Sequence, residues 1–179
     1  MTSDKDDQST TRGSGSGNGS GNGSGNGQRI ESGSDVTEFL LQQIYVKDFS
    51  YEAPNAPGIF TGNQDAEPDV SLNISSSHRS LGDGHHEVVL ELTVNARLGD
   101  RTMFLLEIQQ AGVFTIHGCS DDDRRRLLGI HCPSTLFPYA REAISSAVSR
   151  GGFPPLILQP INFEALYLQA QAGTVSAQA

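Results

Sequence analysis

Two stretches of alternating residues, joined by the dipeptide Gly99-Asp100, constrain the fold of this chain more than any other feature. A period of two is typical of half-buried β-strands, and a two-residue connection with glycine favours an antiparallel hairpin. One side carries Val88, Leu90, Leu92, Val94, Ala96 and Leu98 on the first arm, and Thr102, Phe104, Leu106, Ile108, Phe114 and Ile116 on the second. The other side of the second arm carries Arg101, Met103, Leu105, Glu107 and Gln109. The pattern predicts an antiparallel sheet with one apolar face.

Two further segments predict strands that precede this hairpin. Residues 44–52 are rich in β-branched and aromatic residues, and residues 69–74 alternate strictly. In the first segment Tyr45, Lys47, Phe49 and Tyr51 fall on one side, and Ile44, Val46, Asp48, Ser50 and Glu52 on the other. In the second, Val70, Leu72 and Ile74 form an apolar side. The two prolines within residues 53–58 break the chain between them.

Helical signals follow the hairpin. Ser120 with three aspartates behind it predicts a helix start, and Pro133 predicts the start of a second helix with an apolar stripe. Asn162 predicts the cap of a short helix that runs through Leu168. Strands followed by helices predict an α+β fold, in which two to three helices pack on one face of a four-stranded antiparallel sheet.

The two ends of the chain differ from this central region. Every odd position from Gly13 to Gly27 is glycine, and the residues between them are serine and asparagine. Such a run buries too little apolar surface to offset its ordering entropy. We expect a flexible tail over residues 1–35, one folded domain over residues 36–168 and a flexible C-terminal tail over residues 169–179.

The charge of the chain narrows the range of partners. With 21 acidic and 12 basic residues the formal net charge is −9, which argues against binding to nucleic acid or to an anionic membrane. No apolar stretch approaches the ~18 residues of a membrane span, and the first residues lack the pattern of a secretory signal. Two cysteines do not form a disulfide framework. We expect a cytoplasmic protein with reduced thiols.

Catalytic and metal motifs are weak. The lysines of the chain, Lys5 and Lys47, follow no phosphate-binding loop, and neither a dinucleotide fingerprint nor a nucleophile elbow occurs. The sequence predicts that the protein is not an enzyme and needs no cofactor. His117, Cys119, His131 and Cys132 form one possible zinc set, but their spacing departs from the usual C-x₂-C pattern. Free thiols and histidines at the ends of elements are the favoured interpretation, so no metal is expected.

Asp48, Glu52 and Glu107 leave two interpretations open. An open strand face offers no pocket that raises the pKa of one carboxyl group, so acid–base catalysis is not favoured. The carboxylates are either a solvated face or a docking surface for a partner. Met103 and Leu105 lie on the same side as Glu107, and an exposed apolar spot with a charged rim favours docking.

Five segments in order make the chain resemble the SecB family of bacterial protein-export chaperones. They are residues 48–57 (DFSYEAPNAP), 104–114 (FLLEIQQAGVF), 136–142 (LFPYARE), 148–154 (VSRGGFP) and 160–166 (PINFEAL). The resemblance spans about Ile44 to Leu168. It implies an ATP-independent holdase that keeps preproteins unfolded and delivers them to the SecA motor, and a homotetramer built as a dimer of dimers. A SecB-like chaperone dedicated to one partner, such as an antitoxin, is the alternative.

The resemblance also implies roles for individual residues. It assigns SecA binding to Asp48, Glu52, Leu105 and Glu107, which in the family meet a lysine-rich tail of SecA that carries its own zinc. It places Phe60, Phe163 and Leu166 at the wall of a client-binding groove, next to the apolar side of Val70, Leu72 and Ile74. It places Leu106, Ile108 and Gln110 near the contact between dimers. The glycine-rich tail and the charged run over residues 120–126 depart from the family pattern, and no acidic residue follows Glu164.

Overall fold

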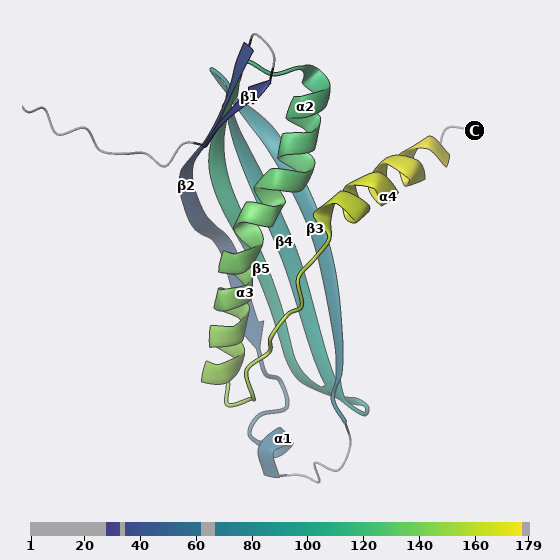
Figure 1. The fold of residues 1–179 in the computed structure, drawn as a ribbon. Coiled ribbons are helices and arrows are strands. Elements are labelled where there is room, and N and C mark those ends of the chain that lie inside the picture. The colour runs from purple at the N-terminus through teal and green to yellow at the C-terminus, as the bar shows by residue number, and fades with distance from the viewer. Residues whose placement is uncertain (1–27, 33–34, 62–66, 177–179) are drawn as a thin grey trace, which may run out of the picture.

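The structure is a computed structural model that describes residues 28–32, 35–61 and 67–176. Five antiparallel strands form one twisted sheet in the order β1-β2-β5-β4-β3, with the helices on one face (Figure 1). The strands are β1 (Gln28–Ser32), β2 (Asp35–Glu52), β3 (Asp69–Gly82), β4 (His85–Leu98) and β5 (Arg101–His117). The four long strands confirm the predicted four-stranded antiparallel sheet, and the short β1 extends it at the β2 edge.

The hairpin of β4 and β5 forms around Gly99 as expected, but it contains one irregularity. Gly99 has a positive φ of 59°, a value that glycine adopts without strain. Arg97 pairs with Thr102 beside the turn, whereas Ala96 pairs with Phe104, so Met103 is an extra residue. This β-bulge places the apolar residues of both arms on one face, because directly paired residues point to the same side of a sheet.

The helical layer is one continuous column rather than two separate helices. It comprises α2 (Asp121–Arg126), the π-helical turn η1 (Leu127–His131) and α3 (Cys132–Arg150). Ser120 caps the first turn by accepting a bond from the Asp123 amide, as predicted. Pro133 lies in the first turn of α3, as predicted, but η1 leads directly into that helix, so the two predicted helices are joined in one column.

The last helix, α4 (Phe163–Ser176), leaves this column and extends past the β3 edge of the sheet (Figure 1). The Asn162 side chain accepts a bond of 3.0 Å from the Ala165 amide, which confirms the predicted cap. The helix continues well beyond its predicted end at Leu168. Alanine and glutamine, which fill residues 169–172, have high helix propensity, so this part of the expected C-terminal tail is helical.

Residues 28–32 also differ from the expected N-terminal tail, since they pair with the start of β2. The predicted strand at residues 44–52 is accordingly the second half of a much longer β2. Residues 1–27, which contain the glycine alternation, lie outside the described residues. A one-turn helix, α1 (Gly58–Thr61), follows the proline-containing turn.

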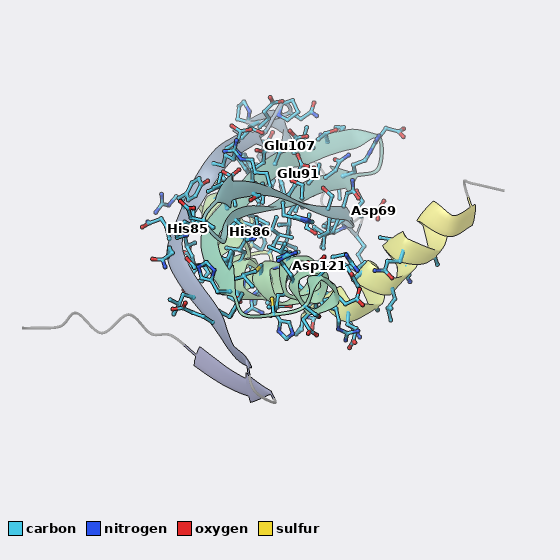
Figure 2. The ribbon with its side chains drawn as sticks, turned by 90° about the horizontal axis from the view of Figure 1, so that it is seen from above. Asp69, His85, His86, Glu91, Glu107 and Asp121 are labelled. Atoms are coloured by element: carbon cyan, nitrogen blue, oxygen red, sulfur yellow. The ribbon has the colours of Figure 1, made fainter. Side chains whose placement is uncertain are left out.

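The core lies between α3 and the face of the sheet that the helices cover, which we call the inner face. The α3 stripe of Leu136, Ala140, Ile144 and Val148 is buried, as its spacing predicted. The alternate residues of β4 and β5, including Leu90, Leu92, Leu106, Ile108 and Phe114, are 0–1% exposed beneath it. The opposite face of the sheet, which we call the outer face, is free of helices (Figure 2).

Candidate functional site

The register of β2 and β5 brings the predicted SecA-binding residues together on the outer face. Glu52 pairs directly with Leu105, and Ser50 pairs with Glu107. Asp48 pairs with Gln109, one rung further along. Side chains on directly paired residues lie ~4.5–5.5 Å apart at Cβ, so Glu52 lies beside Leu105, and Glu107 and Asp48 follow in turn along the same face of the two strands.

These carboxylates are open to solvent. Asp48, Glu52 and Glu107 are exposed, whereas Leu105 is half-buried among its strand neighbours. Within the described residues, none of the three makes an ion pair. A face with uncompensated charge beside an apolar residue is suited to a basic partner, because charge speeds encounter and the apolar contact adds affinity.

Glu91 belongs to the same face and was missed from the sequence. It lies on β4 opposite Gln109, whose amide nitrogen is 3.3 Å from the Glu91 carboxylate, and Ser75 on β3 donates to the same group at 3.1 Å. Figure 2 shows Glu91 beside Glu107 on the side away from the helices. We call Asp48, Glu52, Glu91, Leu105 and Glu107 the acidic face. Aligning the two arms of the hairpin in the sequence would have placed Glu91 opposite Gln109, on the same face as Glu107.

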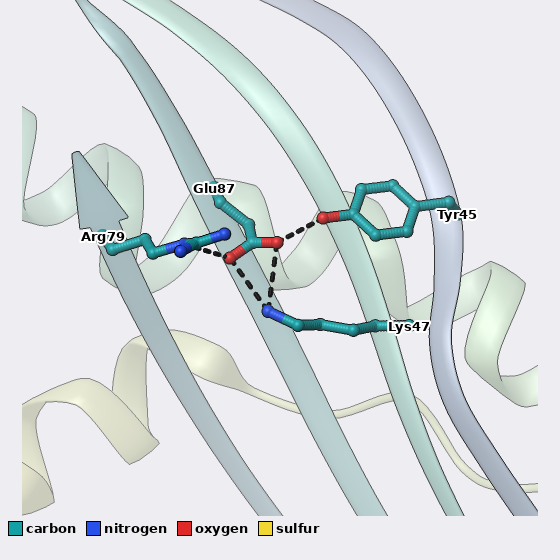
Figure 3. Close-up of polar contacts among 4 residues, drawn as sticks. All are labelled: Tyr45, Lys47, Arg79 and Glu87. Carbon is teal, nitrogen blue, oxygen red and sulfur yellow. Dashed lines mark hydrogen bonds and ion pairs between the residues drawn. The ribbon is translucent and has the colours of Figure 1, made fainter. Parts of the chain in front are cut away.

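A buried carboxylate, Glu87, lies further along the same side of β4 and is only 4% exposed. Tyr45 and Lys47 on β2 and Arg79 on β3 all donate to it (Figure 3). The Lys47 ammonium is 3.0 Å and the Arg79 Nε atom 2.6 Å from Oε2. The Tyr45 hydroxyl holds the pKa of Glu87 down to about 2, with Lys47 and Arg79 acting in the same direction. The same bond raises the pKa of Tyr45.

The position of Tyr45 corrects the expected alternation of β2. The sequence placed Tyr45 with Phe49 and Tyr51, but a β-bulge at Lys47 separates them. Tyr45 pairs with Ala111, so it faces outward, whereas Phe49 and Tyr51 pair with the inner-face residues Ile108 and Leu106. Strict alternation fails here because one extra residue reverses the facing of every residue after it.

A groove of about 510 Å³ lies between β3, η1 and α4. It brings together three of the predicted client-binding residues, Ile74, Phe163 and Leu166, and adds Tyr167. Ile74 and Tyr167 are half-buried and Leu166 is 39% exposed, so the groove offers apolar surface to a ligand. Phe163 is 6% exposed and packs edge-on against Phe137, so it supports the floor of the groove rather than its rim.

The other predicted groove residues lie outside this groove. Val70 and Leu72 are on the inner face of β3, where they pair with Ala96 and Val94 and remain 42% and 38% exposed. They extend the apolar surface of Ile74 along the same strand. Phe60 lies in α1, where its ring is 5.0 Å from that of Phe153.

The residues predicted at the contact between dimers are interior. Leu106, Ile108 and Gln110 are 0–2% exposed beneath the helical layer, and the Gln110 amide donates to the Tyr45 carbonyl at 2.9 Å. Within a single chain these side chains are covered by the helical layer. The sequence identified them as apolar and helix-facing, but exposure depends on α3, which covers them.

A comparison of the chain with known families decides its identity. The family model described as preprotein translocase subunit SecB matches residues 33–174, which is most of the chain. The chain belongs to the SecB family.

Curated SecB proteins agree with this assignment. The chain is 47% identical over 152 residues to the protein-export protein SecB of Nitrosococcus oceani, which covers 85% of this chain and 92% of that protein. It is 49% identical over 139 residues to the SecB of Chromobacterium violaceum, which covers 78% of this chain and 91% of that protein. The resemblance drawn from the five sequence segments is thereby confirmed.

A solved structure of SecB type has the same fold. The SecB-like chaperone of Mycobacterium tuberculosis, in complex with a ChAD peptide from the HigA1 antitoxin, superposes with a TM-score of 0.57 at 15% identity. The match covers 69% of this chain and 90% of that one. At this identity the similarity supports the SecB fold of the present chain and nothing finer.

The cysteines and histidines that formed a possible zinc set do not converge in this SecB chain. Among the described residues no group of three or more metal-ligating side chains is close enough to hold an ion. Cys132 is buried and Cys119 half-buried, and both are free thiols. Burial raises the pKa of each thiol. The described helices include none that is long and apolar enough to cross a membrane.

Proposed function

We propose that this SecB-family export chaperone holds unfolded preproteins in the groove between β3 and α4 and presents them to SecA through the acidic face. The observation that carries the proposal is the separation of these two surfaces. The groove opens on the inner side of the sheet, and the acidic face lies on the outer side. One chain therefore has room for a client and a motor at the same time.

The groove suits an unfolded client. Apolar side chains of Ile74, Leu166 and Tyr167 line it, and the exposed Val70 and Leu72 continue its surface along β3. Burial of apolar surface contributes ~25 cal/mol per Å² and requires no particular client sequence. Such binding uses no nucleotide, which fits the missing phosphate-binding loop, and the protein is expected to have no catalytic activity.

The acidic face suits SecA. Asp48, Glu52 and Glu107 are exposed along β2 and β5 next to Leu105, and none has an ion-pair partner among the described residues. A lysine-rich segment would supply the missing positive charge. Because the partner is a cytoplasmic motor and the client is not yet exported, we expect the protein to act in the cytoplasm.

We further propose that four chains assemble as a dimer of dimers. Several large apolar side chains are exposed on α3, in the segment that follows it and along β2, including Tyr139 at 51%, Ile157 at 72% and Val46 at 51%. Burying them against sister chains would remove a large apolar area from water. In this assembly α3 would rest on the buried side chains of Leu106, Ile108 and Gln110, so these residues would contribute indirectly.

One experiment tests client, motor and assembly together. Light scattering of the purified chain should give the mass of four chains, and an unfolded preprotein should remain soluble only in its presence. Adding SecA should produce a larger complex. A tetramer that protects the client but never binds SecA would favour a chaperone dedicated to one partner, whereas the curated relatives named as export proteins favour SecA.

A further inference from the structure

The β-bulge at Lys47 decides which way Asp48 and Glu52, the β2 residues of the acidic face, point. Val46 pairs with Gln110 and Asp48 with Gln109, so Lys47 is an extra residue in β2. Because of it, Tyr45 and Asp48 both face outward although they are three residues apart. Without the bulge Asp48 and Glu52 would point toward the helices, since a shift of one residue reverses the facing of a strand.

The side chains around this bulge are held by one buried group. Tyr45, just before the bulge, and Lys47, the bulged residue, both donate to the Glu87 carboxylate on β4 (Figure 3). They reach it across β5. Ala111, the residue of β5 that pairs with Tyr45, has a small side chain that leaves space above the strand for them to cross. Arg79 holds the same carboxylate from the opposite side, on β3.

We propose that Tyr45, Lys47 and Glu87 are positioning residues for SecA docking: they anchor the β2 bulge to β4 and thereby hold Asp48 and Glu52 beside Leu105 and Glu107. This inference rests on the proposed docking of SecA at the acidic face. The three residues need not touch SecA. Their contribution is to keep the carboxylates of two strands in one arrangement, which lowers the cost of ordering them on binding.

A double variant, Tyr45→Phe with Lys47→Met, separates positioning from charge. It removes both anchors on β2 and one positive charge close to the acidic face. A pure charge effect would tighten the binding of a basic partner, whereas loss of positioning would weaken it. We expect the Kd for SecA to rise by about tenfold, measured by calorimetry on the full chain.

Arg79→Met provides the matched control. It removes the same charge from the same carboxylate but leaves the bulge anchored through Tyr45 and Lys47. Its Kd should equal that of the wild type or fall slightly. Lys47→Arg keeps a donor at the bulge and should bind normally. Amide hydrogen exchange over residues 46–50 should accelerate in the double variant alone, while the tetramer mass and the protection of client remain.

The outcomes distinguish this inference from the proposed function. If the wild type does not bind SecA, the proposed docking fails and the positioning role falls with it. If the wild type binds, and Asp48→Lys with Glu107→Lys abolishes binding, but the anchor variant binds as tightly as the wild type or more tightly, positioning is refuted and the docking face stands. An equal loss in Arg79→Met would refute a role specific to the bulge.

Discussion

The ring of Tyr167 lies against Gly129, so closely that a Cβ atom on Gly129 would come within 2.5 Å of the ring atom Cδ2. Gly129 belongs to η1 and Tyr167 to α4, and both line the client groove. This contact seats α4 on the helical column, together with the ion pair between Arg126 and Glu164 at 3.1 Å. The shape of the groove therefore depends on a residue without a side chain.

The first prediction follows from this contact. Gly129→Ala should displace Tyr167 and loosen α4, although alanine favours the helix by ~1 kcal/mol. We expect faster amide hydrogen exchange over residues 163–172 and weaker client protection. Gly58→Ala is the control, because a Cβ there has no atom within 4 Å. Unchanged exchange in α4 would show that Tyr167 is not needed to seat it.

A second prediction concerns the groove itself. Ile74→Asp with Leu166→Asp places two carboxylates on facing walls of the groove, so an apolar client segment should no longer bind. Aggregation of an unfolded preprotein should proceed as without chaperone, while light scattering gives an unchanged oligomer. Leu168→Asp is the matched control on α4, since this leucine is 53% exposed and does not line the groove. Full protection by the double variant would move the client site elsewhere.

The third prediction uses the low pKa of Glu87. Its pKa is depressed from 4.5 to about 2, so its stabilising effect is complete above pH 4.5 and is lost as the pH falls toward 2. Glu87→Gln should reduce the free energy of unfolding at pH 7 by about 2 kcal/mol, because it removes charge-assisted hydrogen bonds from a buried site.

Urea titrations between pH 7 and pH 2 check this prediction. The difference between wild type and Glu87→Gln should shrink as the pH falls through that range. Glu91→Gln, which changes an exposed carboxylate on the same strand, should alter stability by less than ~0.5 kcal/mol. A difference that is constant with pH would mean that folding does not lower the pKa of Glu87.

The fourth prediction separates the interior of the chain from its assembly surface. Leu106→Glu introduces a charge at a site that is 0% exposed, so the chain itself should lose several kcal/mol of stability rather than dissociate cleanly into dimers. Tyr139→Glu alters an exposed position on α3. It should lower the mass of the oligomer in light scattering, while the circular dichroism spectrum stays that of the wild type. A folded dimer from Leu106→Glu would instead support a direct contact of this residue between dimers.

How far the sequence predicts this structure depends on the bulges. Alternation identified β4 and β5, and their apolar sides face the core as expected. A two-residue turn alone would pair Leu92 with Glu107, and the bulge at Met103 is what pairs Leu92 with Ile108. The apolar pattern therefore already requires this bulge. The bulge at Lys47 has no such local signal, because the anchor that holds it, Glu87, is distant in the chain.

The client groove was only partly predictable for a similar reason. The amphipathic pattern after Asn162 predicted a helix, but not its direction relative to the sheet. That direction depends on the seat of Tyr167 on Gly129, a contact between two elements. The resemblance placed Phe60 at the groove wall, yet its ring packs at a tilt against Phe153, outside the groove. Composition identifies apolar residues, whereas only the packing decides which of them remain accessible.

The last prediction addresses the acidic face. Asp48→Lys with Glu107→Lys reverses two charges of the acidic face, on exposed side chains that make no ion pair in the described residues, so the fold should be unaffected. SecA binding should be lost, while the tetramer and its client protection persist. Glu91→Lys should weaken binding less, because the Glu91 carboxylate already accepts bonds from Ser75 and Gln109. Binding of the wild type should weaken as salt rises, since charges at an exposed surface are screened over ~8 Å at physiological ionic strength. If the double variant binds SecA normally at low and high salt, the acidic face is only a solvated surface, and SecA must dock elsewhere.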